Sequence, residues 1–439
     1  MLRKIVLLMT LCTIAVGIVL AYRTWISSTT SDARFQEVAN GDAHFWLMQG
    51  GPSDRNMPCT VYYNFDQPLD EATVRLRIQE LANTYQMFQR NVVEIDGLPY
   101  WQSVKPDWSE NFRVLNADDN IETIRIETDA QLSKAAKPGE GLPLFRAYLS
   151  ADRRQLIFIW HHVISDLEGM FNKHAKHLFA EQGERTHFGY QIDADTKTAS
   201  SADTLKPLRK LLNTERPLGF KGSDFEVEKF VLPVQDQALN RLAQRAGLSM
   251  SNIFSFITLR AVTQYHTALG DAEHVDLVPV LTPLSLRTSA LDLDEGNNRA
   301  TKQFPFVFPE ENIADMYTRI IALAPSDSSY NTAGKSMKIA RQFSFLEPIL
   351  RKIAMPDYIS NYFPLADIPL AIHDAKLVSH ALRVPMVPFE RSKFAWSNYN
   401  GEVQLFLHID PQLVDSALMR ASFEKAVTEV LQFLENRSR

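Results

Sequence analysis

Two adjacent histidines followed by an aspartate are the residues of this chain whose types and spacing best suit chemistry: His161, His162 and Asp166. An imidazole with a pKa near 6.5 can take a proton from a hydroxyl or an amine and return it to a leaving group. Adjacent residues leaving a strand point in opposite directions, so only one histidine can face a given cavity. We interpret His162 as a general base that lets an acceptor attack directly, without a serine or cysteine nucleophile.

The flanking segments predict how this pair is positioned. The apolar run from Gln155 to Trp160 predicts a buried strand that ends at the histidines, and a helix is expected from about Glu168. Side chains at such strand-to-loop junctions often line clefts. Asp166 can turn back across the tight loop and brace the backbone near His162. The alternatives are a surface loop with two solvated histidines, or a core histidine bonded to a backbone carbonyl.

His161 to Gly169 resembles the His-His-x-x-x-Asp-Gly motif of the chloramphenicol acetyltransferase-like superfamily, which is shared by condensation domains, plant hydroxycinnamoyl-type acyltransferases and wax ester synthase/diacylglycerol acyltransferases. Further segments match the wax ester synthase layout in order: Asp54 to Met57, Leu142 to Phe145, Pro283 to Arg287, Gly296-Asn297, Ser360-Asn361 and Ser397 to Gly401. Leu167 and Glu168 separate the aspartate from the glycine, so either the loop is wider or Gly169 does the turning. The lack of an Asp-Phe-Gly-Trp-Gly segment favours the wax ester synthase branch over the condensation branch.

The resemblance implies an α/β fold of two similar lobes, each a mixed sheet with flanking helices, with an active-site tunnel between them. It implies that His162 is the base, that His161 is the other motif histidine, and that Asp166 is structural. We hypothesise that Asp166 forms an ion pair with Arg287, which is otherwise a solvated arginine. Further candidates for polar tunnel lining and oxyanion donors are Asn361, Ser397, Asn398 and Asn400. Asn400-Gly401 between apolar stretches is equally typical of a hairpin turn.

By the same resemblance, the activity is transfer of an acyl group from a thioester, acyl-coenzyme A, to the hydroxyl of a lipid-like alcohol. No cofactor and no metal are implied, and we expect a monomer. His174 and His177 are spaced for one helix face, which we interpret as solvated rather than metal-binding. The alternatives are a condensation-type N-acyltransferase that uses a carrier-protein thioester, and a non-catalytic, membrane-tethered lipid-binding protein of the same fold.

The N-terminus carries a membrane-sized signal, because no charge interrupts Ile5 to Tyr22. At about 1.5 Å per residue this run covers roughly 27 Å, enough to span a bilayer core. We favour a retained single-pass anchor over a signal peptide cleaved after Val19-Leu20-Ala21. Arg3 and Lys4 outnumber Arg23 around it, which predicts an extracytoplasmic catalytic domain. Acyl-coenzyme A is scarce there, so the donor is otherwise a lipid ester or another exported carrier.

The predicted organisation is an anchor or signal peptide at 1–26, a spacer at 27–41, a first lobe at 42–190, a crossover linker at 191–224 and a second lobe at 225–439. A net charge of −6 without a basic run argues against nucleic-acid binding. Only two cysteines are present, so a disulfide framework is excluded. Strands are expected at 60–65, 225–232, 274–282, 301–308 and 403–409, with a helix capped by Asp70 and helical residues over most of 312–355.

Overall fold

The computed structural model describes residues 35–49, 56–179, 225–270, 280–285, 299–304, 312–322, 329–341, 348–349, 352, 357–365, 369–387 and 390–437. The predicted anchor at 1–26, the linker at 191–224 and Arg287 lie outside this part of the chain. Within the described residues, no helix is both long and apolar enough to cross a membrane.

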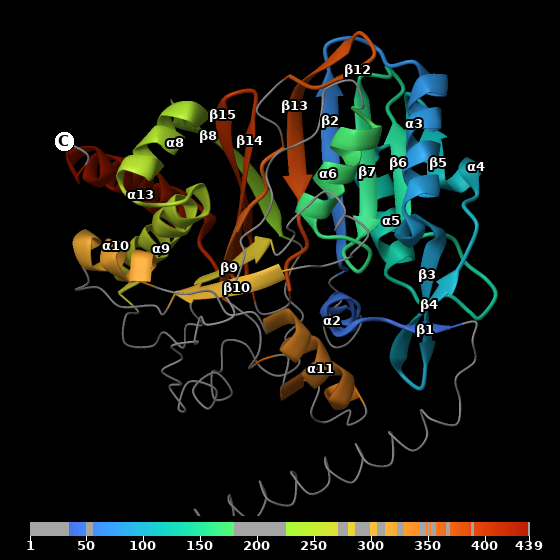
Figure 1. The fold of residues 1–439 in the computed structure, drawn as a ribbon, viewed down its shortest axis with the longest axis horizontal. Helices are drawn as coiled ribbons and strands as arrows, with labels where there is room; N and C mark the ends of the chain where they lie inside the picture. The colour runs from blue at the N-terminus through green and yellow to red at the C-terminus, as the bar shows by residue number, and fades with distance from the viewer. Residues whose placement is uncertain are drawn as a thin grey trace, which may run out of the picture.

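The first lobe is built on a mixed six-stranded sheet of order β12-β13-β2-β7-β6-β5. Its strands are β2 (Pro58–Phe65), β5 (Phe112–Val114), β6 (Phe145–Leu149), β7 (Gln155–His161), β12 (Ala371–Ile372) and β13 (Ala375–Arg383). Its helices are α3 (Glu71–Thr84), the short α4 (Trp108–Asn111), α5 (Ile121–Leu132) and α6 (Leu167–His177). Helices α3 and α6 pack together over one face, and α5 covers the other, where Leu132 meets Ile157 and Ile159. Figure 1 shows α6 lying across β7, the strand that leads into the histidine pair.

The second lobe repeats this plan with a mixed six-stranded sheet of order β10-β9-β11-β14-β15-β8. Its strands are β8 (Glu226–Gln235), β9 (Val280–Ser285), β10 (Arg299–Phe304), β11 (Tyr358–Tyr362), β14 (Ser392–Tyr399) and β15 (Glu402–Ile409). Its helices are α8 (Asp236–Arg245), α9 (Met250–Leu269), α10 (Ile313–Ala322) and α13 (Ser416–Arg437). These helices share one apolar core with the outward face of the sheet, which includes Phe394 and Trp396.

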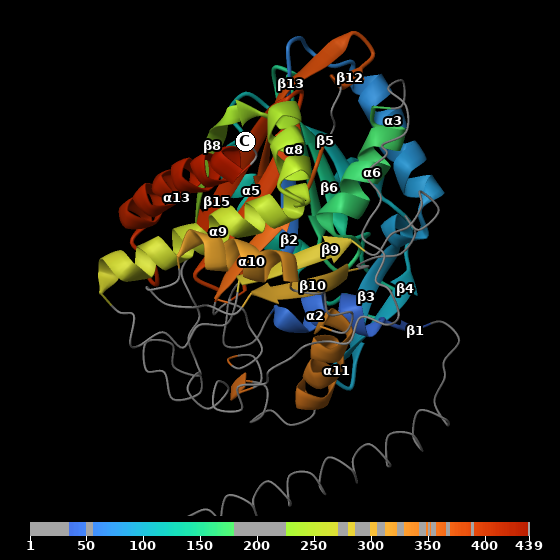
Figure 2. The same ribbon diagram turned by 60° about the vertical axis from the view of Figure 1, so that its left-hand side comes forward.

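The lobes do not divide at the predicted boundary, because β13 belongs to the first sheet. It pairs antiparallel with β2, so that Leu382 lies opposite Val61 although more than 300 residues separate them. Figure 1 shows this strand beside β2, at the side of the first sheet that faces the second, and Figure 2 shows the same arrangement turned by 60°. The core of the first lobe therefore includes Phe363, Leu377 and Phe406 from the second half of the chain. The chain thus crosses from the second lobe into the first sheet, and this crossover fixes the two sheets to each other.

A third, three-stranded sheet joins β1 (Gln36–Glu37), β4 (Leu98–Ser103) and β3 (Arg90–Ile95), and the short 3₁₀ helix η1 (Gln86–Gln89) precedes it. Helix α2 (Asn40–Met48) follows β1 and packs against α11 (Ser329–Arg341). The predicted spacer at 27–41 is therefore wrong at its end, because residues 36–41 are part of the folded domain. Ala43 and Leu47 of α2 are buried in the first core, which explains why this segment folds.

Candidate active site

The loop after β7 is held rigidly by backbone hydrogen bonds. The His161 N–H donates to the carbonyl of Leu144 at the start of the neighbouring strand, and the Ile164 N–H closes a turn onto the His161 carbonyl. The His162 N–H donates to the Met57 carbonyl over 3.1 Å. The Trp160 indole N–H donates to the Ser165 carbonyl. Two segments that carried the family resemblance, at Met57 and at Leu142 to Phe145, thus lie against the motif.

His161 is enclosed by the protein and uses both ring nitrogens. Its Nδ1 accepts a hydrogen bond from the Val163 N–H, so the proton lies on Nε2, which donates to Gln49 Oε1 over 2.6 Å. The ring is fully buried and faces Trp46 of α2. Burial lowers the pKa of His161 well below its ordinary value, and the neighbouring His162 lowers it further. A neutral imidazole with a hydrogen bond at each ring nitrogen holds the loop in place.

His162 is half-buried, and its ring lies against an aromatic side chain of α2. The Phe45 and His162 rings are stacked, with centroids 3.7 Å apart and planes inclined by 6°. The ring is therefore neither in open solvent nor inside an apolar core. The structure separates the two motif histidines as strand alternation predicts: one is locked inside, and the other sits at the surface of the loop.

Asp166 caps the helix that follows the motif. Its Oδ1 accepts a hydrogen bond from the Gly169 N–H over 2.7 Å at the first turn of α6, and the carboxylate is buried. Gly169 is already helical, so the expectation that it turns the loop is wrong. The extra residues Leu167 and Glu168 form the first turn of the helix, and the capping bond reaches the glycine across them. The proposed partner Arg287 lies outside the described residues.

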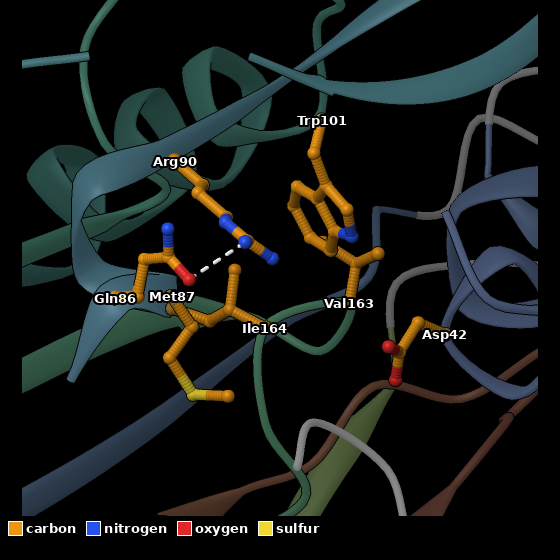
Figure 3. Close-up of a pocket in the computed structure, with 7 residues that line it drawn as sticks. All are labelled: Asp42, Gln86, Met87, Arg90, Trp101, Val163 and Ile164. Atoms are coloured by element: carbon orange, nitrogen blue, oxygen red, sulfur yellow. Dashed lines mark hydrogen bonds between the residues drawn. The ribbon is translucent and has the colours of Figure 1, made fainter. Parts of the chain in front are cut away.

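A small open pocket of about 130 Å³ adjoins the motif loop, as Figure 3 shows. Val163 and Ile164 form one wall, and η1, β3, β4 and α2 supply the others. Arg90 donates to Gln86 Oε1 at its edge, and Asp42 of α2 lies on the opposite side. Typical small-molecule sites are roughly 300–1,000 Å³ and mostly apolar. The size and polar rim of this pocket do not suit a long acyl chain.

The second-half candidates lie on central strands of the second sheet. Three segments that carried the resemblance occupy the neighbouring strands β9, β11 and β14. Ser360 accepts from Thr258 of α9 and so faces the helices, which turns Asn361 toward the first lobe. Asn361 is buried, and its Oδ1 has no hydrogen-bond partner among the described residues. Asn361 thus places an unsatisfied hydrogen-bond acceptor at the junction of the lobes.

Ser397, Asn398 and Asn400 are not brought together. Ser397 faces the first lobe and bonds His380 on β13, whereas Asn398 points to the helix side and donates to Asp236 of α8. Strand alternation therefore keeps these two from lining one cavity. Asn400 is exposed in the turn between β14 and β15, with φ of 50°, and Gly401 follows with φ of 82°. Asn400 is the hairpin residue of the alternative interpretation, not an oxyanion donor.

The predicted solvated face of α6 is wrong at His174. This ring is fully buried, and its Nδ1 bonds the Tyr63 hydroxyl over 2.8 Å, while His177 stays half-buried beside Tyr85. Helix α6 packs against both the sheet and the neighbouring helix α3, so His174 and His177 both meet protein. No group of three or more His, Cys, Asp or Glu side chains among the described residues is placed to hold a metal ion.

Three residues of the candidate site were not identified from the sequence: Phe45 of α2, Gln49 at the C-cap of that helix, and His380 of β13. Gln49 lies 112 positions before His161 along the chain. No local pattern around these residues marks them, since each reaches the site through tertiary packing alone.

No family model and no curated protein matches the chain. Solved structures do. The first condensation domain of the calcium-dependent antibiotic synthetase, in complex with a substrate analogue, is similar at TM-score 0.57 and 15% identity, covering 92% of this chain and 97% of that one. A mutant starter condensation domain of rhizomide synthetase with C8-CoA and Leu-SNAC gives TM-score 0.56 and 11% identity, covering 93% and 96%.

The wax ester synthase/diacylglycerol acyltransferase from Marinobacter aquaeolei VT8 gives TM-score 0.48 and 13% identity, covering 91% of this chain and 100% of that one. That score is too low to carry an argument about the branch. At the identities of the two condensation domains, the likeness shows the fold over nearly the whole chain.

Proposed function

We propose that this chain, which has the condensation-domain fold of the chloramphenicol acetyltransferase-like superfamily, is an acyltransferase with His162 as its general base. One observation carries the proposal: the loop after β7 holds His162 half-buried at a strand end, while its neighbour is locked inside by Gln49. A base works best when its surroundings keep it fixed, because misplacement by a fraction of an ångström reduces proton transfer.

In the proposed mechanism, His162 takes the proton of an acceptor hydroxyl while the oxygen attacks the carbonyl carbon of a thioester. The carbon–oxygen bond forms, the carbon–sulfur bond then breaks, and the histidinium returns its proton to the departing thiolate. Fixed donors stabilise the oxyanion between these steps, and losing one such donor costs about 3 kcal/mol of transition-state stabilisation. Asn361 is our candidate for this role, because its side chain faces the first lobe and its Nδ2 carries two N–H donors.

We propose an acyl thioester as donor and a lipid-like alcohol as acceptor. The bound C8-CoA of the starter condensation domain supports an acyl-coenzyme A donor. The Leu-SNAC bound to the same domain favours a second candidate function, transfer to an amine. A non-catalytic lipid-binding protein of this fold is the third candidate, and the ordered histidine loop argues against it.

Attachment to a membrane remains a proposal that rests on residues 1–26. If the anchor exports the catalytic domain, the donor is a lipid ester or an exported carrier instead of acyl-coenzyme A. Reporter fusions at the C-terminus decide this point, because a reporter that is active only outside the cytoplasm reveals the side on which the folded domain lies.

The deciding experiment measures thiol release from C8-CoA by the full chain, with a long-chain alcohol and a long-chain amine offered separately as acceptors. Wild type is expected to release thiol and to form ester with the alcohol. We expect His162→Ala to lower the rate by at least a hundredfold, because general base catalysis contributes about 10²–10⁴.

The matched control is His373→Asn, which replaces an exposed histidine in the turn between β12 and β13 whose φ is 56°. Asparagine tolerates that backbone conformation, so this variant should keep the wild-type rate. A folded His162→Ala protein with the turnover of wild type would reject the proposed base. Product formed only with the amine would instead establish the condensation-type reaction.

A further inference from the structure

The contact between Phe45 and His162 has an unusual geometry for two aromatic rings. With centroids 3.7 Å apart and planes at 6°, the rings overlap almost face to face. Neutral aromatic pairs avoid this arrangement and prefer offset or edge-on packing, because the negative faces of the two rings repel each other. A cation behaves oppositely, since it is attracted to the ring face.

Two other histidines of this chain provide an internal comparison. His174 meets the Phe158 ring at 72°, and His380 meets the Phe171 ring at 89°, both edge-on. Burial lowers the pKa of each to about 3, so these rings stay neutral. His408, whose pKa burial also lowers to about 3, meets the Phe225 ring at 43°. The neutral imidazoles compared here are thus edge-on or tilted against their aromatic neighbours, whereas the stacked ring of His162 has the geometry that suits an imidazolium.

Helix α2 holds Phe45 firmly in this position. The Trp46 indole N–H donates to Glu94 Oε1 over 2.9 Å, and Gln49 accepts from His161. On the other side, Lys338 of α11 donates to the Val38 carbonyl over 2.6 Å just before the helix. Gly334 of α11 approaches the Asn40 carbonyl so closely that a Cβ there would lie 1.8 Å from the oxygen. The helix that carries Phe45 is thus held from two sides, which fixes the backbone position of the ring.

Resting on the proposed role of His162 as base, we propose that Phe45 is a positioning residue for the acyl transfer. Its ring face stabilises the positive charge that His162 acquires when it takes the acceptor's proton, and releases that stabilisation when the proton passes to the thiolate. It also covers one face of the imidazole, so that the acceptor approaches the ring edge, where the nitrogen lone pair lies.

Other titratable groups lie near this pair, and they stay the same when Phe45 is changed. His161 interacts electrostatically with His162, and the His44 ring meets the Phe45 ring edge-on. Asp166 follows in the motif and Asp42 precedes Phe45 on α2, while Cys59 of β2, which lies opposite Trp160, is influenced by Asp166 and Lys393. His161 stays neutral because it is buried, and burial likewise raises the pKa of the Cys59 thiol, which stays protonated. A change in pH dependence on altering Phe45 therefore reports on the stack.

The test compares Phe45→Leu, which keeps an apolar side chain but removes the ring face, with Phe45→Tyr, which keeps the ring. For Phe45→Leu we expect kcat/KM for thiol release to fall about tenfold, and the midpoint of its acid limb to move about one pH unit lower. The direction follows because a less stabilised imidazolium loses its proton more readily and is a weaker base. Phe45→Tyr should retain the wild-type rate and profile.

His162→Ala separates this inference from the function on which it rests. If His162→Ala stays active, the proposed function fails. If it is inactive while Phe45→Leu keeps the rate and pH profile of wild type, only the inference about Phe45 is overturned. A rise in activity for Phe45→Leu overturns it too, because the ring would then be an obstructing cover. In a His162→Ala background, Phe45→Leu should cause no further loss.

Discussion

The imidazole of His380 on β13 hydrogen bonds the hydroxyl of Ser397 on β14, with 2.9 Å between Nε2 and Oγ. The same hydroxyl donates to the Phe363 carbonyl over 2.9 Å, so the His380 Nε2–H must be the donor to Ser397. Both side chains are buried. Because β13 belongs to the first sheet and β14 to the second, this chain of hydrogen bonds links the two lobes at the strand that crosses into the first sheet.

Ser397→Ala should destabilise the protein by about 1–3 kcal/mol, since it leaves the buried His380 donor without an acceptor. Urea denaturation measures the loss. Ser416→Ala is the matched control, because that hydroxyl bonds Glu226 at the surface, and we expect its cost to stay below about 0.5 kcal/mol. Equal costs for the two variants would contradict a stabilising role of this buried bond between the lobes. A structural Ser397 also predicts an unchanged rate below the unfolding temperature.

Asp166→Ala and Asp70→Ala remove caps of the same geometry from α6 and α3. Asp70 Oδ2 accepts from the Thr73 N–H over 2.8 Å, as Asp166 Oδ1 does from Gly169. Losing a cap costs about 0.5–2 kcal/mol, so both variants should lose stability in that range by thermal denaturation. Only Asp166→Ala is expected to lower acyl transfer, by at least tenfold, because its helix begins in the motif loop. Equal acyl-transfer rates for the two variants would show that Asp166 does not contribute to the active site.

Local patterns predicted the elements with a clear periodicity or cap. The strand before the histidines, the Asp70 cap, β8 and β15 are confirmed. Helix α9 was missed because its buried residues include every position from Ile253 to Leu259, so that an amphipathic stripe is absent. The position of β13 could not be predicted either. Its partner β2 lies more than 300 residues earlier in the sequence, and the pairing of two strands leaves no local signal in either of them.

The candidate site divides in the same way. The motif located His162 and Asp166, because a strand end and a helix cap are local features. Phe45, Gln49 and His380 come from other parts of the chain, so the motif could not identify them. Asn398 and Asn400 were grouped with Ser397 by closeness in sequence, whereas alternation along β14 and the positive φ of Asn400 separate them in space.

The buried histidines predict that the protein loses stability in mild acid. Burial, to which nearby cations add a smaller effect in the same direction, lowers the pKa of His174, His380 and His408 to about 3, against about 6.5 in the unfolded chain. Between pH 3 and pH 6.5 the unfolded state therefore binds more protons than the native state does. Stability is therefore fully present above pH 6.5 and falls by about 1.4 kcal/mol per pH unit for each such histidine as the pH drops toward 3.

Asp129 acts in the opposite direction. Burial raises its pKa to about 7 despite Arg125 beside it, so this carboxyl stabilises the native state at low pH and loses that contribution as pH rises through 7. One carboxyl does not offset three histidines, so urea midpoints should still fall between pH 6.5 and 4. His380→Gln, which keeps a donor for Ser397 but cannot titrate, should make this fall shallower. An identical slope would show that His380 is not neutral in the native state.

The hairpin at Asn400 and Gly401 gives a prediction about what does not contribute to catalysis. Gly401→Ala places a side chain at φ 82° and 2.9 Å from Gln235 Oε1, so we expect a loss of about 1 kcal/mol or more. Asn400→Gly suits the same turn and should leave both unfolding and acyl transfer nearly unchanged. A large loss of transfer in a stable Asn400→Gly protein would restore Asn400 to the site.

Asn361 should show the opposite behaviour, because a residue kept for function often costs stability. Its Oδ1 is buried without a hydrogen-bond partner among the described residues, and replacing an unsatisfied polar group by an apolar one of similar shape is neutral or stabilising. Asn361→Leu should therefore unfold at the same urea concentration as wild type or a higher one. If the Asn361 Nδ2 group donates to the oxyanion, the same variant should lower kcat by about 10²–10³ with little change in KM. Ser360→Ala on the opposite face of β11 is the matched control, since it removes the acceptor of the Thr258 hydroxyl and should lose stability but keep kcat. An Asn361→Leu protein that transfers acyl groups at the wild-type rate would exclude this side chain from the reaction.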